Sequence, residues 1–217
     1  MFLFNLDENQ ALVSVSPHDF VAFWEERYPE AEYSTEDYER YLNVRGLLSD
    51  ENVRSLIDWK FKFLPQEERQ SLVSTVAPKV KQRLKQFNEF RLMDYVSDFA
   101  FGRFWELSWR LAGEVGLRFV LATYLLHIPR PWDYPMVDRH VLRTRHFITT
   151  GQIRKDPLEN LADEQALNVF QAYRNFFAKF VFESHSGPRE VDKAFWSFGK
   201  LLNEPKAQFL PKQAIGS

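Results

Sequence analysis

The feature that most constrains this chain is a near-continuous series of helix start and stop signals, without the turn pairs that close tight β-hairpins. The dipeptides Asn-Gly, Asp-Gly and Gly-Gly are all absent. Ser16-Pro17 places an N-cap serine before a proline at the first helical position, and Ser34 and Ser49 precede two acidic helix starts. The sequence therefore predicts an all-α fold, with residues 1–217 forming a single helical domain.

Apolar spacing predicts roughly ten helices. After the starts at Ser16, Ser34 and Ser49, a fourth helix is expected to begin at Pro65. Pro78 should break that helix from the next one, because an interior proline removes a backbone donor and clashes with the preceding turn. The further helices are expected at 79–87, 89–100, 102–112, 117–128, 138–149, 163–183 and 188–202.

Composition supports a sizeable core and excludes several kinds of site. The 217 residues include twenty-one Phe, eight Tyr and six Trp but no Cys, which excludes disulfides, Cys-ligated zinc and iron–sulfur clusters. No two of the five histidines pair at i, i+4, so a His-based metal site is not expected. Phosphate-loop and dinucleotide-binding motifs are absent too, and no cofactor is expected. The N-terminus has no basic leader, and the longest apolar stretch, residues 119–128, is too short to span a bilayer. We therefore expect a cytoplasmic protein that does not enter membranes.

Charge is distributed unevenly along the chain. Residues 1–58 carry a net charge of −9 and residues 59–117 a net charge of +3. Residues 118–155 carry +5 and also hold three histidines, whereas residues 156–217 return to −1. The basic segment at 118–155 predicts an anionic partner, with a solvated helix face as the alternative.

One stretch within this basic segment has a distinctive order of features. A glycine-containing turn at 113–116 leads into an apolar helix, and a proline-bounded loop then leads to a second helix that starts at Asp138. An Asp at an N-cap accepts backbone N–H bonds and lies at the positive end of the helix dipole, which favours the carboxylate form. Arg139 and Arg143 follow at i, i+4, so the sequence predicts a fixed anion beside a basic flank.

These residues resemble the helix-hairpin-helix superfamily of base-excision DNA glycosylases. The segment Tyr134-Pro135-Met136-Val137-Asp138-Arg139-His140-Val141-Leu142-Arg143 is similar to the family's Pro-x-Val-Asp-x-His-Val-x-Arg element, in which the Asp is the catalytic carboxylate. The hairpin departs from the family pattern: its glycines are three residues apart, it lacks the proline, and Glu114 stands between Gly113 and Gly116. Arg118 stands where members with lyase activity carry a nucleophilic Lys, and an arginine cannot form a Schiff base.

Three further segments are similar to a bacterial branch of that superfamily with a degenerate hairpin: Leu56–Lys60, Tyr124–His127 and Val191–Lys200. The resemblance implies a glycosylase-like core at 49–202 without an iron–sulfur cluster. An acidic helical segment at 1–48 would precede the core, and a tail at 203–217 would follow it.

The resemblance also implies an activity and a partner. A monofunctional DNA glycosylase would flip a damaged or mismatched base out of the duplex and hydrolyse its N-glycosidic bond. Asp138 would stabilise the oxocarbenium-like sugar and orient the attacking water. The DNA backbone would be held by Gly113, Gly116, Arg118, Arg139, His140 and Arg143. The alternative is a non-catalytic member of the fold that binds nucleic acid or protein.

Each of these residues also has a structural explanation. Asp138 can be a helix cap alone, and His127 can be a buried, hydrogen-bonded core histidine. Trp132 and Tyr134 lie in the loop beside Asp138, which makes them candidates for a pocket wall. The remaining tryptophans that occur at helical spacing are expected to pack in the core: Trp59, Trp105, Trp109 and Trp196.

Overall fold

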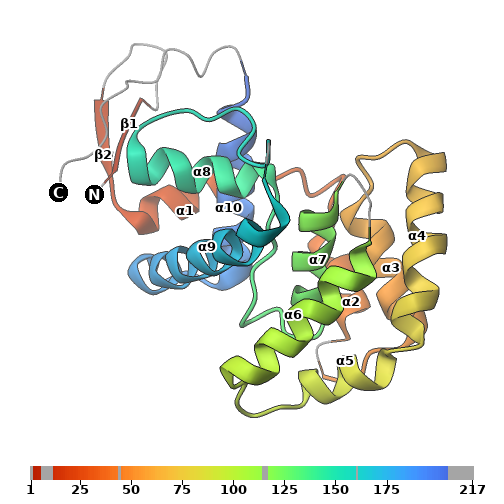
Figure 1. Cartoon of the computed structure of the whole chain (residues 1–217). Coiled ribbons are helices and arrows are strands. Elements are labelled where there is room, and N and C mark those ends of the chain that lie inside the picture. The colour runs from red at the N-terminus through yellow and green to blue at the C-terminus, as the bar shows by residue number, and fades with distance from the viewer. Residues whose placement is uncertain (1, 6–11, 44, 114–116, 160, 205–217) are drawn as a thin grey trace. The chain divides into compact units, whose positions relative to one another are not determined.

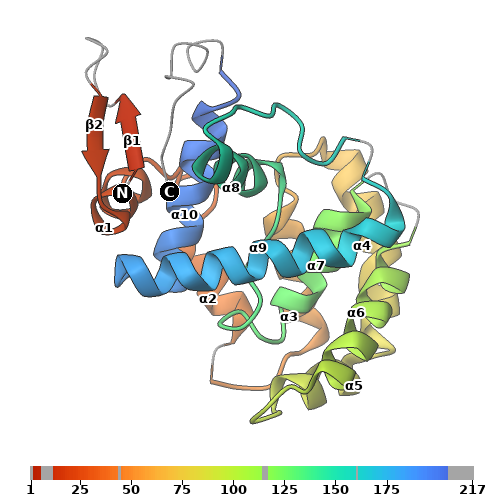
Figure 2. The same cartoon turned by 60° about the vertical axis from the view of Figure 1, so that its left-hand side comes forward.

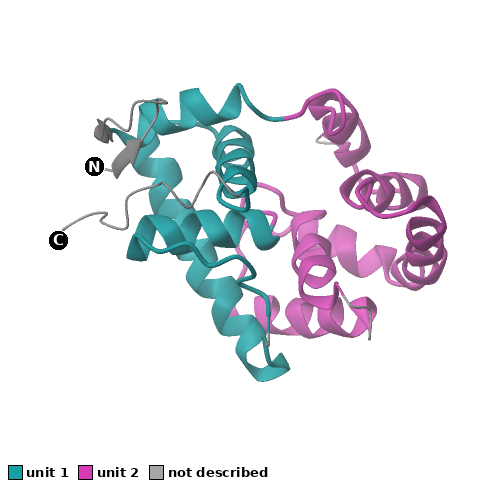
Figure 3. Ribbon diagram, turned by 90° about the horizontal axis from the view of Figure 1, so that it is seen from above, with its two compact units in different colours: residues 1–28, 137–217 teal, residues 29–136 magenta. Residues whose placement is uncertain are grey.

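Ten helices make up most of the chain that the computed structural model describes, which is residues 2–5, 12–43, 45–113, 117–159 and 161–204 (Figure 1). The predicted all-α class is therefore confirmed. The helices divide into two compact units, unit 1 from residues 1–28 and 137–217 and unit 2 from residues 29–136 (Figure 3). This division differs from the single domain with a core at 49–202 that the sequence predicted.

Unit 1 combines the first helix of the chain with the last three. α1 packs against α9 and α10, and α10 also packs along α8. Phe20 of α1 lies at the centre of these contacts, with its ring 5.3 Å from that of Phe198 and 5.7 Å from that of Phe180. The helices of unit 1 are α1 (Pro17–Glu25), α8 (Arg139–Thr150), α9 (Asp163–Ser184) and α10 (Pro188–Leu201).

Two short strands precede α1, which the sequence analysis did not expect. β1 (Phe2–Asn5) and β2 (Leu12–Val15) run antiparallel, with Phe2 opposite Val15 (Figure 2). The sequence analysis relied on the pairs that close two-residue turns, and six residues separate these strands.

Unit 2 is a continuous run of six helices around α7. Every residue from Phe119 to His127 of α7 is buried, as expected for a helix that is apolar on all sides. No helix in the described part of the chain is long and apolar enough to cross a membrane. The helices of unit 2 are α2 (Thr35–Leu42), α3 (Asp50–Lys60), α4 (Gln66–Lys81), α5 (Leu84–Arg91), α6 (Asp98–Ala112) and α7 (Arg118–His127).

The expected helix starts are confirmed more often than the expected ends. Ser16, Ser34 and Ser49 each accept a backbone N–H three residues ahead. The break at Pro78 is wrong, since α4 continues through it to Lys81. Pro78 has no N–H to donate to the carbonyl of Ser74, so α4 lacks that one bond and still continues to Lys81.

Candidate functional site

Asp138 caps α8 in unit 1, as the sequence predicts. Its backbone is extended, and its Oδ1 accepts the N–H of His140 at 2.9 Å and that of Val141 at 3.3 Å. The side chain is half-buried. The positive end of the helix dipole favours a negative charge at this position.

Two tyrosines from other parts of unit 1 lie within the electrostatic reach of Asp138. Burial is the main cause that raises the pKa of Tyr28, and the charges of Asp192 and Asp138 add to it while Arg189 opposes it. Burial likewise raises the pKa of Tyr173 well above its usual value, again with contributions from Asp192 and Asp138. Electrostatic coupling therefore links Asp138 on α8 to Tyr28 just after α1 and to Tyr173 on α9, and Asp192 on α10 acts on both tyrosines; we call these residues the polar cluster.

Arg189 holds one side of this cluster in place. Its guanidinium pairs with Asp192 Oδ2 at 2.5 Å and donates to the Tyr28 hydroxyl at 3.1 Å. It also lies 5.0 Å from the centre of the Tyr28 ring. Asp192 is buried and pairs with this arginine, so α10 contributes an ion pair rather than a free carboxylate.

A row of rings continues from Tyr28. The half-buried Trp196 lies 5.5 Å from the Tyr28 ring and 5.1 Å from the His140 ring, and Lys200 Nζ lies 5.1 Å from the Trp196 ring. His140 Nδ1 accepts from the Arg143 guanidinium at 3.1 Å. Burial lowers the pKa of His140, which favours the neutral imidazole.

Arg143 has a structural role that the sequence analysis did not foresee. The side chain is buried, its Nε donates to the carbonyl of Lys155 at 2.6 Å, and its Nη1 donates to the carbonyl of Gly199 at 3.0 Å. These bonds leave it poorly placed for the phosphate contact expected from its spacing to Arg139. Arg139 itself is exposed.

The rest of the basic segment in unit 1 continues along α8 and beyond it. Arg154 and Lys155 are exposed, and Arg145 is half-buried. Burial, together with the charges of Arg154 and Arg145, lowers the pKa of His146. Arg154 and Arg145 therefore lie close enough to His146 to disfavour its charged form.

The three residues expected to line a pocket belong to unit 2, where two of them are part of the core. His127 is buried, with its Nδ1 2.7 Å from the carbonyl of Tyr134 and its Nε2 bonded to the Tyr38 hydroxyl. The Tyr134 ring stacks on Phe90 and Phe101. The interpretation of His127 as a core histidine is therefore favoured over a catalytic one.

Trp132 is the accessible member of that group. Its side chain is 49% exposed, and the Arg91 guanidinium lies 5.7 Å from its ring. It is the one of the three predicted wall residues that offers a ring face to solvent.

The hairpin expected to bind phosphate is only partly described. Gly113 ends α6 with a φ of 61°, a value that favours glycine. Gly116 lies outside the described residues. Arg118 packs on Trp109, with its guanidinium 4.3 Å from that ring and its Nε donating to the Trp109 carbonyl at 3.4 Å.

The sequence analysis missed Tyr28, Tyr173, Arg189 and Asp192. Arg189, Asp192 and Trp196 recur at helical spacing on α10, and this polar repeat within an otherwise buried helix was the available signal. Tyr173 gave no signal, since a tyrosine in an apolar stripe resembles any core aromatic. Among the described residues, no group of three or more His, Asp or Glu side chains is arranged to hold a metal ion.

A scan against models of known protein families finds no match to this chain, and searches of curated proteins and of solved structures find none either.

Proposed function

We propose that this protein is a monofunctional DNA glycosylase with Asp138 as its catalytic carboxylate. The observation that carries the proposal is the geometry of the α8 cap. Both capping N–H groups bond to the same oxygen, Oδ1, and the carboxylate is half-buried at the positive end of the helix. An anion fixed in this way is suited to stabilise positive charge that develops nearby.

Hydrolysis of an N-glycosidic bond creates such a charge on the sugar. As the bond to the base breaks, C1′ becomes cationic, and a carboxylate beside it lowers the barrier and orients the attacking water. The base must first leave the stack, at a cost of a few kcal/mol. In the same unit, Arg189 pairs with the buried Asp192, and the Trp196 ring packs against the Tyr28 ring.

The exposed cations of unit 1 would hold the DNA backbone. Arg139 adjoins Asp138, and Arg154 and Lys155 are also exposed. Phosphate contacts position a protein on DNA and make its affinity dependent on salt. Arg143 is left out of this set because it holds two carbonyls inside the unit.

A single-turnover assay with Asp138→Asn tests the proposal. The substrates are duplexes that carry uracil or a deaminated, oxidised or alkylated base. Asn still caps a helix, so we expect normal stability and duplex affinity, with base release lowered at least about 100-fold because the anion is gone. Asp98→Asn is the matched control, since Asp98 is an exposed first-turn Asp of α6 in unit 2 and its loss should leave base release unchanged.

Two results would contradict the proposal. One is a wild-type protein that releases no base from any duplex in the panel, and the other is an Asp138→Asn variant as fast as wild type. Asp138→Ala separates catalysis from capping, because loss of the cap should lower the free energy of unfolding by about 0.5–2 kcal/mol whether or not the carboxylate is catalytic.

A non-catalytic binding module is the second candidate. It is favoured by the structural use of three predicted site residues, His127, Tyr134 and Arg143. In this case the protein binds a duplex without releasing a base. Its affinity then falls steeply with salt and weakens in Arg139→Gln, whereas Asp138→Asn binds as tightly as wild type or more tightly.

A further inference from the structure

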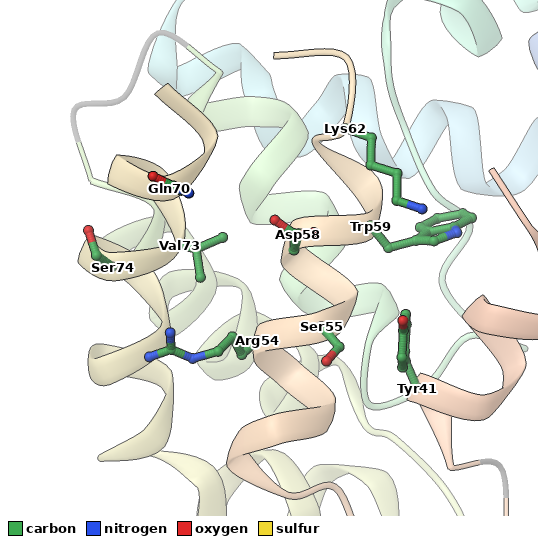
Figure 4. Close-up of a pocket in the computed structure, with 9 residues that line it drawn as sticks. All are labelled: Tyr41, Arg54, Ser55, Asp58, Trp59, Lys62, Gln70, Val73 and Ser74. Carbon is green, nitrogen blue, oxygen red and sulfur yellow. The ribbon is translucent and has the colours of Figure 1, made fainter. Parts of the chain in front are cut away.

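A pocket of about 480 Å³ opens between α2, α3 and α4 of unit 2 (Figure 4). This volume is within the range of small-molecule sites. Tyr41 of α2 and Trp59 of α3 supply aromatic surface, and Gln70 of α4 supplies an amide. Arg54 of α3 and Lys62, just beyond the end of α3, lie at opposite ends of the lining (Figure 4).

The two rings and the one acid of the pocket already have partners. The Trp59 indole N–H donates to the Ser34 carbonyl at 3.1 Å, so this buried ring is a fixed wall. The Tyr41 hydroxyl accepts from Arg40 at 3.3 Å. Asp58, which lies between the two cations, pairs with Arg69 at 3.0 Å.

Arg54 and Lys62 differ from these residues. Both are exposed, and neither side chain has a hydrogen bond or an ion pair with another described residue. Because Arg69 neutralises Asp58, the pocket has an excess of positive charge. Arg54 lies within α3, whereas Lys62 lies two residues beyond the end of α3 at Lys60, and both residues line the same pocket.

This lining selects a ligand with two anionic groups and a planar ring between them. Guanidinium and ammonium groups bind phosphate, the half-buried Tyr41 ring is aromatic surface against which a base can pack, and the Gln70 amide can both donate to and accept from the edge of a base. A nucleoside that carries a phosphate on each side has this chemistry, either free or as one unit of a nucleic-acid strand.

We infer that the pocket between α2, α3 and α4 binds a nucleoside 3′,5′-bisphosphate unit. One phosphate pairs with Arg54 and the other with Lys62, and the base lies against Tyr41. The site is separate from Asp138, because all of its residues belong to unit 2.

Calorimetric titration of the full chain with thymidine 3′,5′-bisphosphate tests this inference. We expect saturable binding that Arg54→Gln and Lys62→Gln each weaken by about tenfold, through loss of one charged contact. Lys79→Gln is the matched control, because Lys79 is an exposed cation of α4 outside the pocket lining. The Lys79→Gln variant should bind the bisphosphate as tightly as wild type does, and all three variants should have wild-type melting temperatures.

Further ligands identify the source and test the chemistry. If a thymidine hexanucleotide binds more tightly than the bisphosphate, with the same dependence on Arg54 and Lys62, the natural ligand is a nucleic-acid strand. If the hexanucleotide binds more weakly, the natural ligand is the free nucleotide. Thymidine and inorganic phosphate should each bind far more weakly. The inference is overturned if the bisphosphate does not bind, if inorganic phosphate binds as tightly, or if neither glutamine variant changes the affinity. Asp138→Asn should leave this binding unchanged, so the result is independent of whether the protein releases a base.

Discussion

Buried arginines show how a charge that looks functional in the sequence can serve the fold. Arg91 donates to the carbonyls of Leu42 and Asn43 at 3.1 and 2.9 Å, where α2 ends. Arg130 donates to the carbonyls of Phe90 and Met93, where α5 ends. Cations are favoured at these positions because helix carboxyl ends carry unsatisfied carbonyls and partial negative charge. Part of the positive charge counted at 118–155 is therefore used inside the protein.

Arg143 and Arg139 provide a matched test of this use at the residue scale. Arg143→Ala should lower the free energy of unfolding by about 2–4 kcal/mol, because it removes the donor to the part-buried carbonyl of Lys155 and to the buried carbonyl of Gly199. Arg139→Ala should change it by less than about 0.5 kcal/mol, since Arg139 is exposed. Urea denaturation of both variants measures the difference. Equal stabilities would show that the two carbonyl bonds of Arg143 contribute nothing to folding.

The same contrast explains which site residues the sequence could predict. The cap at Asp138 was predictable because a cap depends on a few neighbouring residues and on backbone geometry. The burial of Arg143 was not, because spacing at i, i+4 says that two side chains share a helix face without saying whether that face meets solvent. Tyr28 and Tyr173 join the cluster only through contacts among α1, α8, α9 and α10, and no local pattern encodes those.

At the scale of elements, local chemistry sets the helix starts and tertiary packing sets many of the ends. The helices expected at 89–100 and 102–112 are wrong in their bounds, since α5 ends at Arg91 and a single helix α6 covers Asp98–Ala112. Ser97 caps α6 by accepting the Ala100 N–H, and this cap was within reach of the sequence analysis. The apolar residues before it include Leu92 and Tyr95, which are exposed, so their hydrophobicity gave a misleading helical signal.

Replacing either of two glycines inside helices by alanine is expected to change stability in opposite directions. A Cβ added at Gly199 of α10 would lie 1.9 Å from the carbonyl oxygen of His140, so this glycine lets α10 approach α8. Gly199→Ala must push the helices apart and should lower the free energy of unfolding by about 1–3 kcal/mol or more. Gly102 of α6 has open space around its Cβ position, so Gly102→Ala should raise the free energy of unfolding by about 0.5–1 kcal/mol through helix propensity.

Thermal and chemical denaturation of the two alanine variants distinguish these effects. Although both variants replace glycine by alanine, Gly199→Ala should lower the melting temperature and Gly102→Ala should raise it. If Gly199→Ala is as stable as wild type, α10 and α8 do not pack closely enough for a Cβ at position 199 to clash with the His140 carbonyl.

At the scale of the whole molecule, α1 packs with helices from the other end of the described chain. Unit 1 joins α1 to helices that begin more than a hundred residues later, whereas unit 2 is one continuous segment. The sequence analysis treated the chain as one domain because helix signals run through it without a linker. Contacts between distant helices leave no such local trace, so the division into units could not be predicted.

Paired core substitutions test whether the units are separate cooperative bodies. Phe20 is 1% exposed and packs on Phe195 and Phe198 in unit 1, whereas Phe87 is fully buried and packs on Phe104 in unit 2. Each change to Ala should cost about 3–5 kcal/mol within its own unit. Hydrogen exchange followed by mass spectrometry should then show lost protection in α8, α9 and α10 for Phe20→Ala, and in α3 to α7 for Phe87→Ala. If either variant lowers protection equally throughout both units, the chain unfolds as one body and the division has no energetic counterpart.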